Sequence, residues 1–223
     1  MQINSDLIKN TVKAENQIKE KIFSSNFYKD GFTVLFLGNS ITLHGIKEDI
    51  GWHLECGMAA SAPENDYVHL VLKHLKNNFT KVNHTVCNVA DWERAYFDDN
   101  IIANFASAKQ NPPDLSIIRL GENIALSNLE KYPLKPYLER FCKFFKGTRQ
   151  TIVTDLFWSH SGMDKLIQEI CTENGFTYCP IGDLGFDDEN KAIGLFEHPG
   201  VAMHPGDLGM KRIAERIIDK INF

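Results

Sequence analysis

The chain has 223 residues, of which 43% are hydrophobic and 24% charged, and its formal net charge is -5. This composition is ordinary for a folded protein, and the length suits one α/β domain. Basic and acidic residues are mixed along the chain, which argues against a nucleic-acid partner. No apolar run approaches the roughly 18–20 residues that cross a bilayer, and the amino terminus lacks the apolar segment of a signal peptide. We therefore expect a cytoplasmic protein without a membrane partner.

The predicted elements begin with a helix from Ser5 to about Phe23, which carries one apolar stripe. We expect residues 1–223 to form a single domain, with residues 1–30 as a helical extension packed on it. Apolar runs predict strands at 33–37, 82–89, 115–120, 150–157 and 176–181. Helices are predicted at 66–77, 133–146, 163–174 and 206–221, and a loop and helix at 90–109.

The strands and helices alternate along the chain, and this alternation is typical of a parallel sheet with helices on both faces. Five strands in this pattern suit the flavodoxin-like order 2-1-3-4-5. We therefore predict an α/β fold of three layers, with a five-stranded parallel sheet in the middle. In open sheets of this kind, ligands bind at the carboxyl ends of the strands.

The first strand runs into the segment LGNSIT (37–42), which places the hydroxyl of Ser40 at that edge of the sheet. A serine hydroxyl is a poor nucleophile until a base takes its proton, and a histidine supplies such a base near neutral pH. The oxyanion that forms then needs preorganised donors, such as a backbone N–H and an asparagine amide. Asn123 in GEN (121–123) and His204 in HPGVAMHPGD (198–207) supply these side chains at loops that should reach the same edge.

These segments resemble the motif blocks of the SGNH (GDSL-type) hydrolase superfamily, from about Phe32 to the carboxyl end. GNSIT is similar to the first block, GEN to the third, and the histidine before the last helix to the fifth. The segments GNSITLHG (38–45), IGW (50–52), GMAAS (57–61) and DYVH (66–69) also resemble a subgroup of small bacterial hydrolases of this type. The resemblance implies a serine esterase with Ser40 as nucleophile, His204 as base and Asn123 as the oxyanion-hole amide. It implies a small-molecule ester substrate and no metal or organic cofactor.

The sequence departs from the family pattern at two positions. The second block has a glycine whose backbone N–H serves the oxyanion hole, and counting from Asn88 places Glu93 there. We expect the backbone N–H of Glu93 to take this role. The fifth block has an acid three residues before the histidine, and Val201 occupies that position. Glu197, Asp187 or a backbone carbonyl could replace the acid, or a Ser-His dyad could act without one.

Several alternatives stay open on the sequence alone. His198 rivals His204 as the base, because both precede a proline and a glycine. Trp92 and Trp158 follow strands, and either line a substrate cleft or pack helices on the sheet. The expected reaction is hydrolysis of O-acyl esters, with short acyl groups and carbohydrate esters favoured. Acyl transfer to a sugar or alcohol is the alternative, as is a binding protein of this fold that has lost catalysis. The oligomeric state is not indicated.

Overall fold

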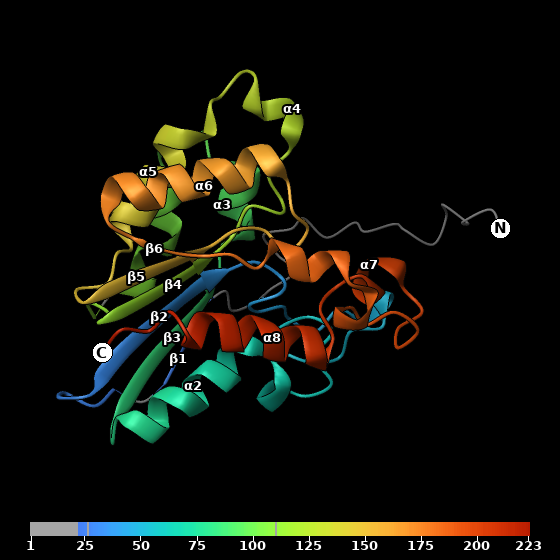
Figure 1. Ribbon diagram of the computed structural model, residues 1–223, viewed down its shortest axis with the longest axis horizontal. Coiled ribbons are helices and arrows are strands. Elements are labelled where there is room, and N and C mark those ends of the chain that lie inside the picture. The colour runs from blue at the N-terminus through green and yellow to red at the C-terminus, as the bar shows by residue number, and fades with distance from the viewer. Residues whose placement is uncertain (1–21, 26, 110) are drawn as a thin grey trace.

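A computed structural model describes residues 22–25, 27–109 and 111–223 of the chain. Within this part, six strands form one sheet in the order β1-β3-β2-β4-β5-β6 (Figure 1). The strands are β1 (Ile22–Ser24), β2 (Phe32–Gly38), β3 (Val82–Asn88), β4 (Leu115–Arg119), β5 (Gln150–Thr154) and β6 (Thr177–Cys179). β2 to β6 are parallel, whereas β1 pairs antiparallel with β3.

The five parallel strands confirm the predicted order, because β3-β2-β4-β5-β6 is the order 2-1-3-4-5 of the predicted strands. The predicted number of five strands is wrong by one, since β1 adds a sixth, antiparallel strand. The predicted helix from Ser5 to about Phe23 is wrong at its carboxyl end, because Ile22 and Phe23 belong to β1. Residues 5–21 of this predicted helix lie outside the part of the chain that the structure describes. Ile22 pairs with Cys87 on the outer edge of β3, where unpaired backbone groups can take up another strand. A strand of three residues is too short for an alternating pattern to reveal it.

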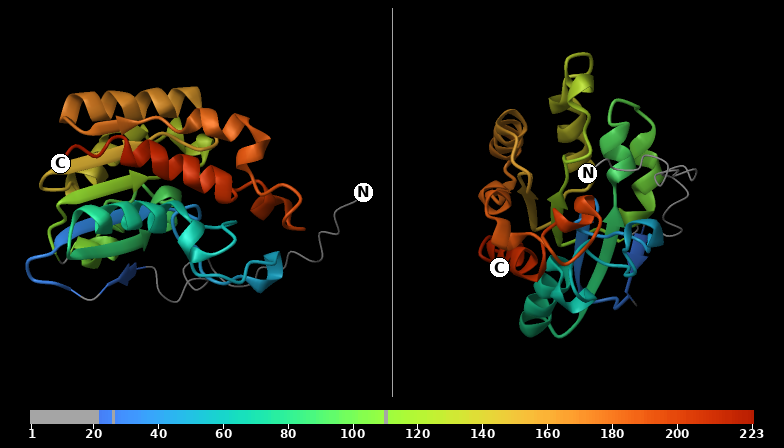
Figure 2. Two further views of the ribbon diagram at one scale, coloured as in Figure 1. Left: turned by 60° about the horizontal axis from the view of Figure 1, so that its bottom comes forward. Right: turned by 90° about the vertical axis from the view of Figure 1, so that its right-hand side faces the viewer.

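Helices cover both faces of the sheet (Figures 1 and 2). α2 and α8 lie on one face, and α3, α5 and α6 on the other. The described helices are α2 (Tyr67–Asn78), α3 (Ala90–Arg94), α4 (Leu126–Leu129), α5 (Leu134–Phe144), α6 (Ser161–Asn174), α7 (Pro199–Ala202) and α8 (Asp207–Ile218). Short 3-10 helices occupy 48–50, 63–65, 101–109, 182–186 and 188–190, so the helix expected within 90–109 is two separate pieces. None of the described helices combines the length and the apolar character that crossing a membrane requires.

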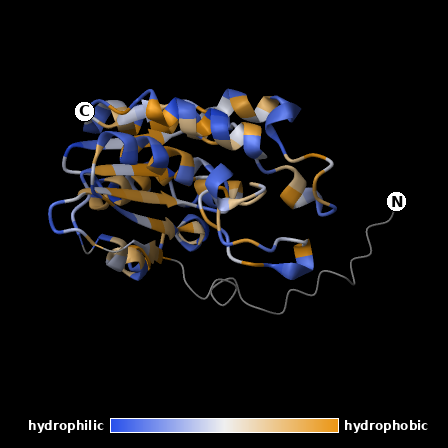
Figure 3. Cartoon of the chain, turned by 90° about the horizontal axis from the view of Figure 1, so that it is seen from below, coloured by the Kyte–Doolittle hydropathy of each residue, from blue (hydrophilic) through white to orange (hydrophobic). Residues whose placement is uncertain are grey.

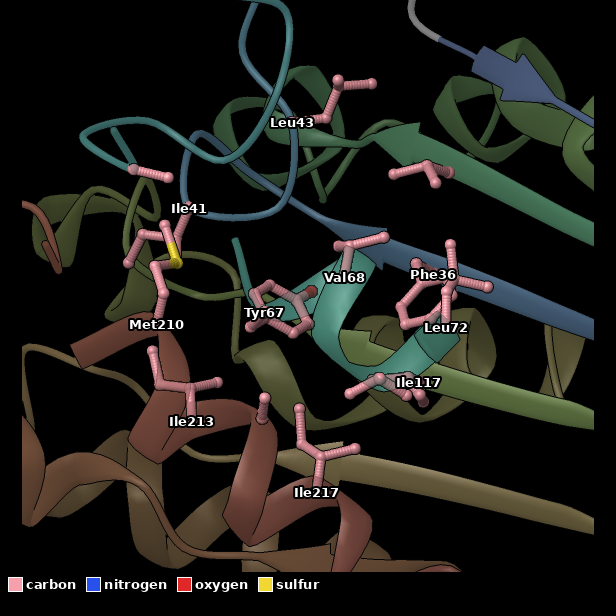
Figure 4. Close-up of a cluster of buried hydrophobic side chains, with 14 of the residues drawn as sticks. Phe36, Ile41, Leu43, Tyr67, Val68, Leu72, Ile117, Met210, Ile213 and Ile217 are labelled. Carbon is pink, nitrogen blue, oxygen red and sulfur yellow. The ribbon is translucent and has the colours of Figure 1, made fainter. Parts of the chain in front are cut away.

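The strands are largely hydrophobic because helices bury both of their faces (Figure 3). Along β2, Phe36 packs under α2 and α8, whereas Leu35 and Leu37 pack under the helices of the opposite layer. Figure 4 shows the first of these layers, in which Val68 of α2 and Ile213 of α8 pack with the side chains of the sheet. A shift of β2 by one residue would exchange its two faces, so the packing fixes where the strand ends.

The loops at the carboxyl ends of the parallel strands build the candidate site. The segment that follows β2 and the segment around α7 lie side by side beyond this end of the sheet (Figures 1 and 2). Gly38 ends β2 in close contact with its neighbours: a Cβ there would lie 1.9 Å from Thr42 Oγ1 and 2.6 Å from the carbonyl oxygen of Arg119. Only glycine therefore fits between β4 and the turn that carries Ser40.

Candidate active site

Ser40 lies in a tight turn directly after β2. The Asn39 carbonyl accepts a hydrogen bond from Thr42 N–H, which closes the turn, and Met58 N–H donates to the Ser40 carbonyl. Ser40 Oγ lies 2.8 Å from Nε2 of His204, which is 164 residues further along the chain. The fold therefore brings the serine predicted as nucleophile into hydrogen-bond contact with the histidine predicted as base.

His204 is held in place by its surroundings and is neutral. Its carbonyl accepts a hydrogen bond from Ala192 N–H, and Trp158 packs edge-on to the imidazole with ring centroids 5.0 Å apart. Burial lowers the pKa of His204 to about 4, although the carbonyl of Gly200 opposes the shift. At pH 7 the ring is therefore uncharged, which is the state in which Nε2 can accept a proton.

The second ring nitrogen of His204 meets a backbone carbonyl and not a carboxylate. Nδ1 lies 2.6 Å from the oxygen of Gly200 in α7. Val201, at the position of the family's acid, is buried in the core. The structure does not bring Glu197 to the imidazole, since this residue is exposed beside a neighbouring hollow, and Asp187 pairs with an arginine of α8. The Gly200 carbonyl thus fixes the tautomer with hydrogen on Nδ1 and a lone pair on Nε2.

Two of the three predicted oxyanion donors lie at the site, although the Asn123 amide also donates to the Glu93 carboxyl group. Ser40 N–H donates to no acceptor within the described residues, and Asn123 lines the same pocket as Ser40. The prediction for the backbone N–H of Glu93 is wrong, because this group donates to the carbonyl of Val89 at 3.2 Å. α3 begins at Ala90, directly after β3, so position 93 already lies inside a helix that uses its N–H.

The carboxyl group of Glu93, unlike its backbone, belongs to the site. It is fully buried and accepts hydrogen bonds from Asn123 Nδ2 at 2.5 Å, from Asn39 Nδ2 at 2.9 Å and from Gly121 N–H. Burial and the neighbouring Glu122 raise the pKa of Glu93 to about 7. Sequence reasoning assigned only a backbone role to this residue. The signal that could have found the side chain was a carboxyl group at a position where the family has glycine.

A second carboxylate and one guanidinium complete this buried cluster. Arg119 Nη1 donates to Glu122 Oε1 at 2.5 Å, and Asn39 Nδ2 donates to Glu122 Oε2 at 2.6 Å. Arg119 Nη2 also donates to Asn39 Oδ1. Although burial acts in the opposite direction, the charge of Arg119 lowers the pKa of Glu122 below its usual range. Asn39, directly before Ser40, is thereby held at both ends of its amide, and the cluster supports the turn of the nucleophile.

A pocket of about 250 Å³ opens over Ser40 and His204. Its remaining wall mixes apolar and polar residues: Ile50, Met58, Ala90, Gly200 and Val201, and His44, Asn88, Asp91, Arg94, Asn123 and His198. His198 lies in this wall, but the histidine that contacts Ser40 is His204. Among the described residues, no group of three His, Cys, Asp or Glu side chains could hold a metal ion.

The two tryptophans that follow strands have different surroundings. Trp92 is fully buried and packs against Phe141, with ring centroids 4.4 Å apart, so it holds α3 on α5. Trp158 is partly buried and packs on the imidazole of His204. Neither belongs to the described wall of the pocket. Trp92 is therefore a core residue, and Trp158 buries the ring of the candidate base.

No family model matches this chain, and no curated protein matches it by sequence. Solved structures match its fold. A Bacteroides ovatus protein described as a GDSL-like lipase matches over 85% of this chain and 97% of its own, at 14% identity and a TM-score of 0.53. The esterase EstA from Pseudoalteromonas matches over 84% of this chain and 95% of its own chain, at 12% identity and a TM-score of 0.52. The salicylyl-acyltransferase SsfX3 of a tetracycline biosynthetic pathway matches over 85% of this chain and 54% of its own chain. Its identity is 13% and its TM-score is 0.52.

The chain therefore has the fold of the GDSL-type (SGNH) esterases and lipases. It spans about half the length of some of the structures that it matches, including the acyltransferase. Identities this low relate folds and not activities.

Proposed function

We propose that this protein is a serine ester hydrolase that works through an acyl-enzyme. The observation that carries the proposal is the 2.8 Å contact between Ser40 Oγ and Nε2 of a partly buried, neutral His204. The carbonyl of Gly200 holds Nδ1–H, so the lone pair of Nε2 faces the serine hydroxyl. This pair lies at the edge of the sheet where open α/β folds bind ligands. The fold shared with GDSL-type esterases supports the same reaction class.

The proposed reaction has two halves. Ser40 Oγ attacks the ester carbonyl while His204 Nε2 takes the hydroxyl proton, and Ser40 N–H and the Asn123 amide hold the oxyanion. The bond to the alcohol then breaks, and the imidazolium returns its proton to the leaving oxygen. Water attacks the acyl-enzyme with the same base, which releases the carboxylic acid and restores the serine. The Gly200 carbonyl takes the place of the usual triad carboxylate in orienting the ring.

The pocket favours small and polar esters. Its volume of about 250 Å³ is below the roughly 300–1,000 Å³ of pockets that bury drug-sized ligands, which suits a short acyl group. His44 adds a polar contact, because its Nδ1 is taken by the Gly45 carbonyl at 2.6 Å and its Nε2 has no partner among the described residues. An unprotonated Nε2 accepts hydrogen bonds from hydroxyl groups, as a carbohydrate would offer. We therefore favour short-chain O-acyl esters of hydroxyl-rich alcohols.

Acyl transfer is the second candidate, and the fold shared with an acyltransferase favours it. The two activities share every step up to the acyl-enzyme and differ only in whether water or an alcohol attacks it. A binding protein that has lost catalysis is the third, motivated by the absent triad acid. The intact contact between serine and histidine argues against it.

Turnover of an aryl acetate, with and without an added alcohol, tests the proposal. The wild-type protein should release the aryl alcohol, and acetate should remain the main product when the alcohol is present. Ser40→Ala should abolish turnover, whereas Ser127→Ala, at an exposed serine of α4, should retain it. Equal rates for the wild type and Ser40→Ala would refute the mechanism. Conversion of most of the acetyl group to an acetylated alcohol would identify a transferase.

A further inference from the structure

The cluster beneath the nucleophile holds two acidic side chains and one basic side chain. Glu93 and Arg119 are fully buried, and the side chain of Glu122 is 5% exposed. Among the described residues, Glu122 from the loop after β4 acts on Glu93, and Arg119 of β4 pairs with Glu122. On the helix of Glu93 itself, Asp91 and Arg94 pair with each other. One guanidinium balances one carboxylate, and a second ionised carboxylate here would be an uncompensated buried charge. Charge balance therefore favours the state in which the two carboxyl groups retain one proton.

The proton cannot reside on Glu122 without breaking a hydrogen bond. Oε1 accepts from Arg119 Nη1 at 2.5 Å and from Phe157 N–H at 3.1 Å. Oε2 accepts from Asn39 Nδ2 at 2.6 Å and from Arg119 Nη2 at 3.3 Å. A guanidinium and a backbone N–H are donors only, and the Asn39 amide is fixed because its Oδ1 accepts from Arg119. Glu122 is therefore the ionised member of the pair.

One oxygen of Glu93 can carry the proton. Oε1 accepts from Asn39 Nδ2 at 2.9 Å and from Gly121 N–H, and neither of these donors can reverse. Within the described residues, Oε2 has a single partner, the Asn123 amide, whose Nδ2 lies 2.5 Å away. The two ends of an asparagine amide exchange places by a half turn about the last side-chain bond. A proton on Oε2 is therefore satisfied when Asn123 turns its oxygen toward it.

We propose that Glu93 is a proton-dependent positioning residue for the oxyanion hole. With a proton on Oε2, it donates to Asn123 Oδ1, and the NH₂ group of the amide is turned toward the pocket. Without that proton, it holds Asn123 Nδ2, leaves the amide oxygen at the pocket and places a negative charge near the oxyanion. The protonated form is the active form, because an oxyanion is stabilised by donors and repelled by acceptors and anions. This role rests on the proposed function, since it acts only through Asn123.

The proposal predicts the pH dependence of kcat. Burial and Glu122 raise the pKa of Glu93 to about 7. A carboxyl group is protonated below its pKa, so the active form is lost as the pH rises through about 7, by roughly tenfold per pH unit beyond it. On the acid side, kcat should fall as the pH drops through about 4, where His204 takes up a proton.

The decisive variant is Glu93→Gln, assayed with an aryl acetate from about pH 5 to about pH 9. The glutamine oxygen can still accept hydrogen bonds from Gly121 N–H and Asn39 Nδ2. The glutamine NH₂ group can donate to the Asn123 oxygen, as the protonated carboxyl group of Glu93 does. The wild-type kcat should fall above about pH 7, whereas Glu93→Gln should keep its kcat across the range. Glu173→Gln, at an exposed glutamate of α6, should fall like the wild type. A wild-type kcat that stays level above pH 7, or a folded Glu93→Gln that falls with the wild type, would overturn the proposal.

Glu122→Gln gives an independent test in the opposite direction. A folded Glu122→Gln leaves Arg119 free to balance Glu93, so its fall in kcat should begin at a lower pH than in the wild type. A fall at the same pH in a variant shown to be folded by circular dichroism would contradict the role of Glu93. Labelling of Ser40 by a fluorophosphonate in the same samples separates this proposal from the proposed function. Absent labelling together with absent turnover would refute the esterase itself. Labelling and turnover with a pH profile that ignores residue 93 would refute only its positioning role.

Discussion

His204→Ala should lower kcat on an aryl acetate by between about 10⁴ and 10⁶, which is the order of loss when a serine hydrolase loses its base. The reason is that Ser40 Oγ has its hydrogen-bond contact with Nε2 of this ring, and no other histidine contacts it among the described residues. Without a base, the serine stays protonated and attacks slowly. The measurement is steady-state turnover near pH 6, with circular dichroism to show that the variant is folded.

His198→Ala is the matched control for this experiment. His198 lies in the wall of the same pocket, also precedes a proline and a glycine, and makes no contact with Ser40. Its removal should change KM more than kcat, because the side chain lines the pocket and makes no hydrogen bond to Ser40. If His198→Ala abolished turnover and His204→Ala retained it, the assignment of the base would be reversed.

Asn123→Ala should lower kcat by about 10²–10³, the usual cost of removing one oxyanion-hole donor. The loss should fall on kcat and leave KM within a few-fold, because the amide contacts the oxyanion and not the ground-state ester. The fold should persist, although the variant leaves Glu93 with one partner fewer. Turnover of an aryl acetate, together with a thermal melt, measures both effects.

An exposed asparagine provides the comparison. Asn78 ends α2 at the surface, and Asn78→Ala should keep the wild-type kcat. A kcat for Asn123→Ala within about threefold of the wild type would remove this residue from the oxyanion hole. The oxyanion would then rest on Ser40 N–H alone.

The fold was largely predictable because the strands are buried on both faces and read as apolar runs. The order of the five parallel strands follows from the alternation of strands and helices, and the structure confirms it. β1 was not predictable, because Ile22 also fits the apolar stripe of the predicted helix. Backbone pairing with the edge of β3 decides the conformation of β1, and the intrinsic helix or strand preference of its residues does not.

The side chains of the candidate site could be predicted from the sequence, whereas the roles of its backbone groups could not. Ser40, Asn123 and His204 were identified from residue type and order, and they line one pocket in the structure. The partner of His204 Nδ1 could only be left among alternatives, since every residue carries a carbonyl and only the turn of α7 selects that of Gly200. The role of Glu93 was misassigned, because counting from Asn88 does not reveal that α3 has already begun.

The central claim is that Ser40 is an activated nucleophile, and covalent labelling tests it most directly. The wild-type protein is incubated with a fluorophosphonate at neutral pH, digested, and the modified peptide identified by mass spectrometry. The structure predicts one adduct on Ser40, at a rate that falls at least about 10³-fold in His204→Ala, because the imidazole supplies the activation. A folded wild-type protein that carries no adduct on Ser40, or one labelled equally fast without His204, would contradict the account.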